Sequence, residues 1–304
     1  MTLHIVPEIN EANGVYQVAR DLARESGGEV VDARKFGVSG LKFDIGTIDE
    51  VWVHGMWLPR IWKACKKVLK LQTSNVKPSL VRMTHGSLSP IYLERQGKWK
   101  KRLVGPIERW LLRRSDRIVA TCEAEREWIR AYVGKGCPEI VVEDLKRFFD
   151  LKEKGERRKE KDDGLHLLYL GRRHPLKGVE FLERAVGEIR RKEKGEGRKC
   201  GVELRIVSDH FGEELERDWE WCDVLVLPTL SENFGRVVAE ALERGKKVIT
   251  TDGAPAWAPP GERSRSEGLG LQWWDRITYL KGYRDGTDED RVRLLKEALE
   301  KVSG

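Results

Sequence analysis

The chain has 304 residues, of which 39% are hydrophobic and 35% charged, and its formal net charge at pH 7 is +7. This length suits two domains with hydrophobic cores, and the absence of a long apolar run excludes a membrane-spanning helix. The five cysteines are scattered without a CxxC pair, so we expect reduced thiols in a cytoplasmic protein rather than a zinc ribbon or a disulfide framework.

The first half of the chain alternates predicted strands with predicted helices. Residues 3–7 form the first predicted strand, and a loop at Asn13-Gly14 leads into a helix over 15–24. Further predicted strands end in small or polar residues and lead into helical stretches, and they cover residues 50–55, 79–86 and 116–121. This alternation is typical of a doubly wound α/β domain, which we assign to residues 1–150.

The second half repeats this alternation after a charged segment. Residues 151–164 (LKEKGERRKEKDDG) are almost entirely charged, which indicates a solvated linker. A second domain is assigned to residues 165–304. Its predicted strands cover residues 165–170, 202–207, 222–228 and 246–251. The last predicted helix, 287–301, has Thr287 as its N-cap candidate and acidic residues in its first turn, and packing back on the first domain is one option for it.

Two glutamates follow the predicted strand 222–228. Glu232 lies in a loop, and Glu240 lies eight residues further on, inside a predicted helix. Ligands of parallel sheets bind at the carboxyl ends of the strands, so Glu232 is expected beside a substrate. Glu240 has two interpretations: a surface residue paired with Arg236 and Arg244, or an acceptor, together with Glu232, for the hydroxyls of a sugar and a ribose. Its position at the edge of the apolar stripe favours the second interpretation.

A cationic loop opens the second domain. Arg172, Arg173 and Lys177 come just before a helix predicted from Val179. A cation at a helix N-terminus is unfavourable by a few tenths to about 1 kcal/mol, unless an anion binds to the cations and the helix amides together. An exposed basic loop is the alternative. A second helix N-terminus at Gly235 would help to hold a diphosphate, and neither a DxD motif nor a His/Cys cluster indicates a metal site.

Basic residues are concentrated in one window of the chain. Residues 55–117 contain sixteen lysines and arginines and three acidic residues. Two helical stretches in this window, 57–70 and 99–114, combine tryptophan and leucine with these cations, as do helices that lie on anionic membranes. The alternative is an apolar stripe in the core with a solvated cationic face. One basic surface implies an anionic partner, but no motif for nucleic acid is present, so a nucleic-acid partner is not favoured.

Motifs in both halves resemble those of family 4 retaining glycosyltransferases with the GT-B fold. The loop 171–178 (GRRHPLKG) is similar to the family's GRxHPxKG loop, and residues 228–242 contain the similar PTLSENFG segment and the E-x7-E pattern. Residues 84–86, 100–117 and 120–125 resemble the acceptor domain of bacterial polysaccharide and lipopolysaccharide transferases. The resemblance implies two Rossmann-like, doubly wound parallel-sheet domains that face a cleft.

The resemblance also implies a role for each candidate residue. Arg172 and Lys177 would neutralise the donor diphosphate. Glu232 would bind hydroxyls of the donor sugar, and Glu240 would bind the nucleotide ribose. His85 would contact the donor sugar from across the cleft, with a histidine that only ends a strand as the alternative. The implied donor-binding set is completed by Gly14, Gly171, Asn233, Phe234, Gly235 and Arg236.

The implied activity is retaining, metal-independent transfer of a hexose from a UDP- or GDP-linked sugar to a glycan or lipid-linked acceptor, without a cofactor. The donor's own phosphate would help to deprotonate the acceptor, so Glu232 is not assigned as a glycosidase-type nucleophile. Residues 208–221 are shorter than the family's usual segment, which shapes the nucleobase pocket. A phosphorylase or epimerase, or a non-catalytic subunit, remains an alternative. The expected location is the cytoplasm, with peripheral binding at the inner face of the membrane.

Overall fold

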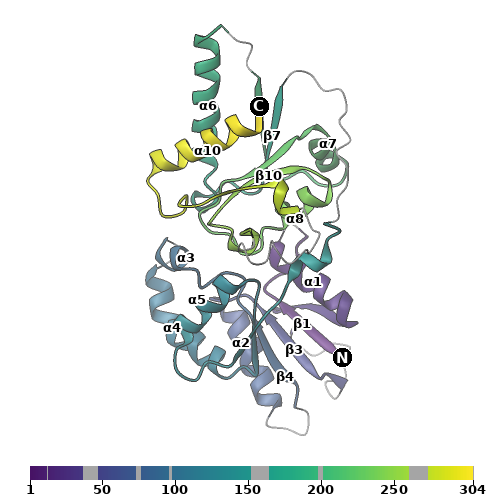
Figure 1. Cartoon of the computed structure of the whole chain (residues 1–304). Helices are drawn as coiled ribbons and strands as arrows, with labels where there is room; N and C mark the ends of the chain where they lie inside the picture. Colours follow the sequence, from purple (N-terminus) through teal and green to yellow (C-terminus); the bar gives the residue numbers. More distant parts are fainter. Residues whose placement is uncertain are drawn as a thin grey trace, which may run out of the picture. The chain divides into compact units, whose positions relative to one another are not determined.

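A computed structural model describes residues 1–11, 13–36, 47–72, 77–95, 98–151, 164–197, 201–259 and 273–303. The chain divides into two compact units, Met1–Phe148 and Phe149–Gly304 (Figure 1). The expected charged linker falls almost wholly on residues 152–163, which lie outside the described residues. Within the described part of the chain, we find no helix whose length and apolarity would let it cross a membrane.

The first unit is built on a parallel six-stranded sheet with the strand order β2-β1-β3-β4-β5-β6. Its strands are β1 Thr2–Val6, β2 Glu29–Asp32, β3 Glu50–His54, β4 Ser79–Met83, β5 Arg117–Ala120 and β6 Glu139–Val142. Its α-helices are α1 Gly14–Ser26, α2 Pro59–Leu71, α3 Pro90–Arg95, α4 Lys98–Arg113 and α5 Glu123–Val133. A short 3₁₀ helix, Leu145–Phe148, ends the unit.

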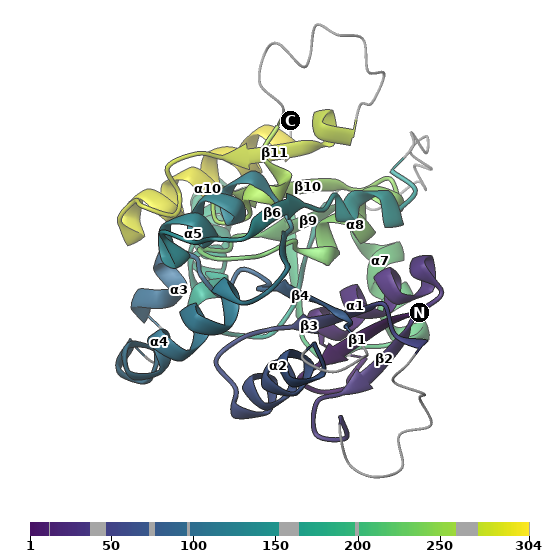
Figure 2. The ribbon, with the colours of Figure 1, turned by 90° about the horizontal axis from the view of Figure 1, so that it is seen from below.

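Helices cover both faces of this first sheet. The crossover from β1 to β2 and the crossover from β3 to β4 run in opposite directions across the sheet. Because such crossovers are right-handed, α1 and α2 lie on opposite faces (Figure 2). Burial on both faces explains why β1, β3 and β4 are almost entirely buried and why most of their residues are apolar.

The second unit contains a parallel five-stranded sheet with the order β11-β10-β9-β7-β8. Its strands are β7 Leu165–Leu170, β8 Val202–Val207, β9 Val224–Leu227, β10 Lys247–Thr251 and β11 Ile277–Leu280. Its α-helices are α6 Val179–Gly195, α7 Glu213–Trp221, α8 Arg236–Glu243 and α10 Asp288–Ser303. Three 3₁₀ helices cover Pro175–Lys177, Pro255–Trp257 and Trp273–Arg276.

The predicted terminal helix is confirmed as α10. Thr287 caps it as expected: its hydroxyl accepts from the amide of Asp290 at 3.2 Å, and the Asp290 carboxylate accepts from the amide of Thr287 at 3.1 Å. Within the second unit α10 packs against α6, where Lys296 donates to Glu188 at 2.8 Å.

In each sheet the strand order reverses at one point. The reversal lies between β1 and β3 in the first unit and between β7 and β9 in the second. Ligands of doubly wound sheets bind outside the carboxyl ends of the strands at such a point. In the second unit the loops at this position cover residues 171–178 and 228–235, which are the two loops singled out by sequence.

Candidate functional site

The loop after β7 is held by its own backbone and by a tyrosine. The Tyr169 hydroxyl donates to the carbonyl of Arg172 at 2.9 Å. The His174 ring accepts from the amide of Leu176 at 3.1 Å, and the amide of Lys177 donates to the carbonyl of His174 at 2.7 Å. These contacts start the short 3₁₀ helix that presents Lys177, and they give His174 a structural role.

The loops after β7 and β9 are joined directly. The hydroxyl of Thr229 and the amide of Leu230 both donate to the carbonyl of Leu176, at 3.0 and 2.8 Å. The backbones approach so closely that a Cβ on Gly178 would lie 2.1 Å from the carbonyl oxygen of Pro228. Gly178 also has a φ of 63°, so glycine is required there on two grounds.

A second contact fixes the β9 loop against the segment after β10. The amide of Glu232 donates to the carbonyl of Gly253 at 2.8 Å. A Cβ on Gly253 would lie 2.1 Å from the carbonyl oxygen of Thr229, and the Thr251 hydroxyl donates to that same carbonyl. Sequence analysis did not identify Thr229 or Gly253 as structural supports of the site, although Thr229 stands within the motif segment 228–242.

Lys177 and Glu232 meet at this junction. The ammonium of Lys177 donates to one carboxylate oxygen of Glu232, and the other oxygen accepts from the amide of Asn233 at 3.0 Å. The two side chains are 22% and 20% exposed, so both can reach a ligand. An ammonium beside a carboxylate can bind a phosphate oxygen and a hydroxyl group of one small molecule.

The two neighbouring arginines of the β7 loop differ in their partners. Arg173 forms an ion pair with Glu183 at 2.7 Å. Arg172 is exposed, and in the described part of the chain no carboxylate forms a salt bridge with it. Arg172 is therefore the cation of this pair that is open to an anionic ligand.

Glu240 lies on α8 with its carboxylate largely shielded from water. Its Oε1 is 3.8 Å from Nε of Arg236, which is too far for a hydrogen bond. Arg244 donates instead to Glu216 at 2.7 Å and to the backbone carbonyl of Glu240 at 3.2 Å. Burial raises the pKa of Glu240, and the nearby arginines oppose that shift. Glu240 thus has the i,i+4 contact with Arg236 that the first interpretation expects, and its role as an acceptor for the ribose stays a prediction.

The segment before α8 leaves the helix N-terminus open. Gly235 has a φ of 66°, and among the residues that the structure describes no side chain caps α8. Phe234 is buried, and its carbonyl accepts from the indole nitrogen of the buried Trp257. Trp257 thus fixes the segment from which Arg236 begins the helix. Sequence analysis assigned no role to Trp257.

In the first unit, His85 ends a row of three histidines that sequence analysis did not predict. The ring nitrogens Nδ1 of His4 and Nε2 of His54 are 3.0 Å apart, and Nδ1 of His54 is 2.9 Å from Nε2 of His85. Burial lowers the pKa of His4 to about 4 and that of His85 to about 3. His85 also has a φ of 52°, a strained conformation for a non-glycine residue that is frequent at functional sites.

Gly14 is the first residue of α1, directly after the cap formed by Asn13. The Asn13 side chain accepts from the amide of Val15 at 2.9 Å, and, apart from the chain neighbours, no atom of the described residues lies within 4 Å of the position that a Cβ on Gly14 would occupy. The surface at Gly14 is thus open to a ligand. The expected contact of Gly14 and His85 with a donor held by the second unit stays a prediction. Over the described ranges, no group of three His, Cys, Asp or Glu side chains is arranged to hold a metal ion.

Two protein-family models match the chain. Residues 48–142 match a family described as "Glycosyl transferase 4-like domain", and residues 164–264 match a family described as "Glycosyl transferases group 1". The two matched segments together span most of the chain. A search of curated protein sequences found no match.

Solved structures of low sequence identity share the fold. Sucrose-phosphate synthase from Thermosynechococcus elongatus is 15% identical, with a TM-score of 0.64 over 99% of this chain and 89% of that one. WaaG, a glycosyltransferase involved in lipopolysaccharide biosynthesis, is 12% identical, with a TM-score of 0.56 over 99% and 90%. A trehalose-phosphate synthase from Burkholderia vietnamiensis is 10% identical, with a TM-score of 0.55 over 99% of both chains.

Proposed function

The chain is a group 1 glycosyltransferase with the GT-B fold, and from this premise we propose that it moves a hexose from a UDP- or GDP-linked sugar to a glycan or lipid-linked acceptor with retention of configuration. The observation that carries the proposal is the contact between Lys177 and Glu232 at the strand reversal of the second sheet. This contact puts a cation for phosphate beside a carboxylate for sugar hydroxyls, within the length of one donor molecule.

The proposed diphosphate site lies between the β7 loop and the start of α8. The exposed Arg172, the ammonium of Lys177 and the uncapped amides of α8 support it. Fixed cations and helix amides stabilise negative charge that develops on a leaving phosphate. We propose that these groups neutralise the diphosphate without a metal ion. In the same arrangement Glu232 binds hydroxyls of the sugar, and Glu240 binds the ribose.

The proposed mechanism uses the donor's phosphate as the base. Glu232 is held by the Lys177 ammonium and by the Asn233 amide, and these contacts make its carboxylate a weaker nucleophile. The bond from the anomeric carbon to the phosphate oxygen breaks, and the acceptor oxygen bonds to the same face of the sugar. The acceptor proton passes to the departing phosphate oxygen, and the attack on the same face conserves the anomeric configuration.

The proposed acceptor is bound near an anionic membrane. On α4 four large apolar side chains are exposed: Trp99, Leu103, Ile107 and Trp110. By contrast, the stripe on α2 is core, since Ile61 and Val68 are fully buried. We propose that the two interpretations of the cationic helices apply to different helices, because α2 packs inward while α4 presents apolar residues among cations. Such a face suits the surface of an anionic bilayer.

Two substitutions test the proposal. We expect Lys177→Ala to weaken the binding of UDP or GDP at least tenfold, because a charge-assisted phosphate contact is lost. We expect Glu232→Ala to keep nucleotide binding and to lower turnover by a factor of about 100 or more. Lys192→Ala is the matched control. Lys192 is exposed on the last turn of α6, and its ammonium lies 3.3 Å from the carboxylate of Glu300 on α10.

Calorimetric titration with UDP, GDP and ADP measures binding, and NMR of the product gives its configuration. Near-normal turnover in both variants would refute the assigned roles. Release of a sugar phosphate that requires inorganic phosphate identifies a phosphorylase. Failure of all three nucleotides to bind would instead favour a non-catalytic subunit.

A further inference from the structure

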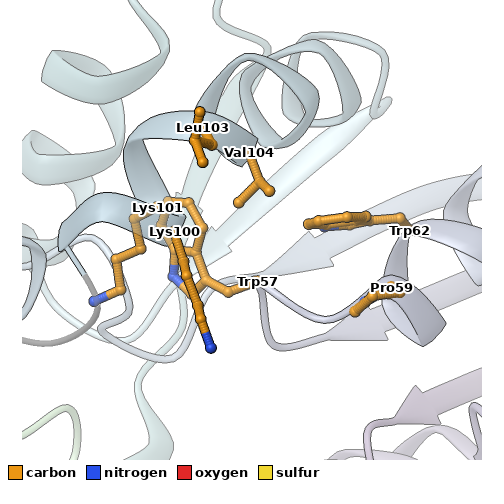
Figure 3. Close-up of a pocket in the computed structure, with 7 residues that line it drawn as sticks. All are labelled: Trp57, Pro59, Trp62, Lys100, Lys101, Leu103 and Val104. Atoms are coloured by element: carbon orange, nitrogen blue, oxygen red, sulfur yellow. The ribbon is translucent and has the colours of Figure 1, made fainter.

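A pocket with apolar walls lies in the first unit beside α2 and α4 (Figure 3). Its volume is about 570 Å³. Apolar side chains from both helices and from the turn before α2 form the walls, and two lysines stand at its edge. The lining residues are Trp57, Pro59, Trp62, Lys100, Lys101, Leu103 and Val104. Apart from the lysines these side chains offer little for hydrogen bonding, so the pocket suits a hydrocarbon chain better than a sugar.

A buried carboxylate fixes the aromatic walls. One oxygen of Glu108 accepts from the backbone amide of Trp57 and, at 2.7 Å, from the indole of Trp62. Its other oxygen lies 3.4 Å from the guanidinium of Arg82, and both side chains are fully buried. Trp57 has a φ of 66°, and strain of this kind persists where the surroundings fix it, often at ligand clamps. The pocket is therefore preorganised.

The cations at the pocket lack an acidic partner. The ammonium of Lys101 lies 3.5 Å from the ring centre of Tyr92 and donates to the Tyr92 carbonyl at 2.6 Å. Burial lowers the pKa of Lys101 to about 8. In the part of the chain that the structure describes, neither Lys100 nor Lys101 forms a salt bridge. A partly buried ammonium without a counter-charge favours an anionic ligand.

Leu103 links the pocket to the exposed stripe of α4. It lines the pocket, and yet 76% of it is exposed. A hydrocarbon chain that leaves a lipid layer in contact with Trp99 and Leu103 would enter the pocket directly. We propose that this pocket binds the hydrocarbon chain of an anionic amphiphile, with its phosphate at Lys100 and Lys101. The proposal rests on the proposed function in one respect, since a lipid-linked acceptor is the expected source of such a ligand.

Calorimetry on the whole protein tests the pocket without any donor or turnover. The probes are decyl phosphate below its micellar concentration, decyl maltoside and inorganic phosphate. We expect decyl phosphate to bind one molecule per chain, at least tenfold more tightly than decyl maltoside, and inorganic phosphate not to bind at this site. Lys101→Met should remove the preference for the phosphate head.

Val104→Trp should fill the pocket and weaken decyl phosphate binding at least tenfold. Phe211→Ala, at an exposed aromatic side chain of the second unit, is the control and should bind as the original chain does. Equal binding by the Val104→Trp chain, with a native circular-dichroism spectrum, overturns the proposal. Competition by phosphatidylglycerol vesicles assigns the pocket to a membrane lipid, and its absence assigns it to a single-chain lipid phosphate. These measurements contain no nucleotide. Absence of the proposed glycosyltransferase activity would therefore change neither the binding of decyl phosphate nor its weakening in the Val104→Trp chain.

The row of histidines carries an independent inference. Each contact joins two ring nitrogens, so in every pair one nitrogen donates and the other accepts. Burial keeps all three rings uncharged, since it lowers the pKa of His4, His54 and His85. Two proton arrangements are then possible. Either His4 donates to His54 and His54 donates to His85, or both hydrogen bonds are donated in the opposite direction.

The remaining nitrogen of His4 decides between them. Nε2 of His4 is buried and has no hydrogen-bond partner in the described structure. A buried N–H without an acceptor is rarer in proteins than an unpaired acceptor, so this nitrogen carries no proton. His4 then donates from Nδ1 to His54, and His54 donates from Nδ1 to His85. We infer that His4 and His54 are positioning residues that hold His85 in the Nδ1–H form, a neutral donor towards an oxygen of the ligand.

Nitrogen-15 NMR of the histidines reads the protonation of each ring directly and needs no activity. At pH 7 we expect His85 to carry its proton on Nδ1. In a His54→Phe chain that keeps its fold we expect a mixture of both tautomers at His85, and His174→Phe serves as the control. A proton on Nε2 of His85 in the original chain, or an unchanged Nδ1–H form in the His54→Phe chain, overturns the inference.

Discussion

At the scale of single residues, the neighbouring Arg172 and Arg173 have different proposed roles: Arg172 binds the ligand, and Arg173 forms a surface ion pair. We expect Arg172→Ala to weaken UDP or GDP binding at least tenfold, because its charge is open to a ligand. Arg173→Ala should leave affinity within twofold and change the melting temperature little, since an exposed ion pair contributes little. Calorimetry and thermal unfolding of the two variants check this. Equal effects on affinity would contradict the assignment of Arg172.

A second prediction at this scale concerns acid stability. Burial lowers the pKa of His4 from 6.5 to about 4. Between these two pH values the unfolded chain therefore binds a proton at His4 that the folded chain does not bind. Stability is then lost as the pH falls from about 6.5 to about 4. In His4→Gln this contribution disappears. The slope of the unfolding free energy against pH should then decrease by up to about 1.4 kcal/mol per pH unit. Urea unfolding at a series of pH values measures the slope, and an identical slope in both chains would argue against it.

At the scale of elements, the junction of the β7 and β9 loops depends on glycine. We expect Gly178→Ala to destabilise the protein by about 2 kcal/mol or more and to weaken nucleotide binding, because a Cβ would collide with the Pro228 carbonyl and the φ is positive. Gly187→Ala is the control, since no atom lies near its Cβ position in α6, and it should stabilise the helix by up to about 1 kcal/mol. Melting temperatures compare the two, and a neutral Gly178→Ala would contradict the required geometry.

The elements also show how far the sequence predicted this structure. Strands buried on both faces could be predicted as apolar runs, but β2 and β6 could not, because half of β2 and none of β6 is buried. Order along the chain placed Lys177 and Glu232 in two loops, and the structure adds the contact between them, while their roles towards a ligand stay predictions. The contact of His4 with His54 depends on which strands are neighbours, and a local pattern does not contain that information. The same applies to α2 and α4, because their similar sequences do not show that α4 exposes four large apolar side chains.

At the scale of the whole molecule, basic charge is concentrated in one part of the chain. Sixteen lysines and arginines fall within residues 55–117, and this window includes α4 with its exposed tryptophans. We expect the protein to float with phosphatidylglycerol vesicles and not with phosphatidylcholine vesicles, because cations and apolar side chains act together on an anionic surface. Raising the salt concentration should reduce recovery, since exposed charges are screened.

A double substitution on α4 distinguishes membrane binding through this helix from non-specific adsorption by exposed apolar side chains. Trp99→Ser combined with Leu103→Ser should reduce recovery with phosphatidylglycerol vesicles about tenfold, since the apolar area that enters the lipid is lost. Phe211→Ser is the matched control, because Phe211 is 57% exposed but lies in the second unit, and it should float as the original chain does. Equal recovery with neutral and anionic vesicles would remove the electrostatic argument. Equal loss in the control would remove α4 as the contact, because binding would then follow exposed apolar area wherever it lies.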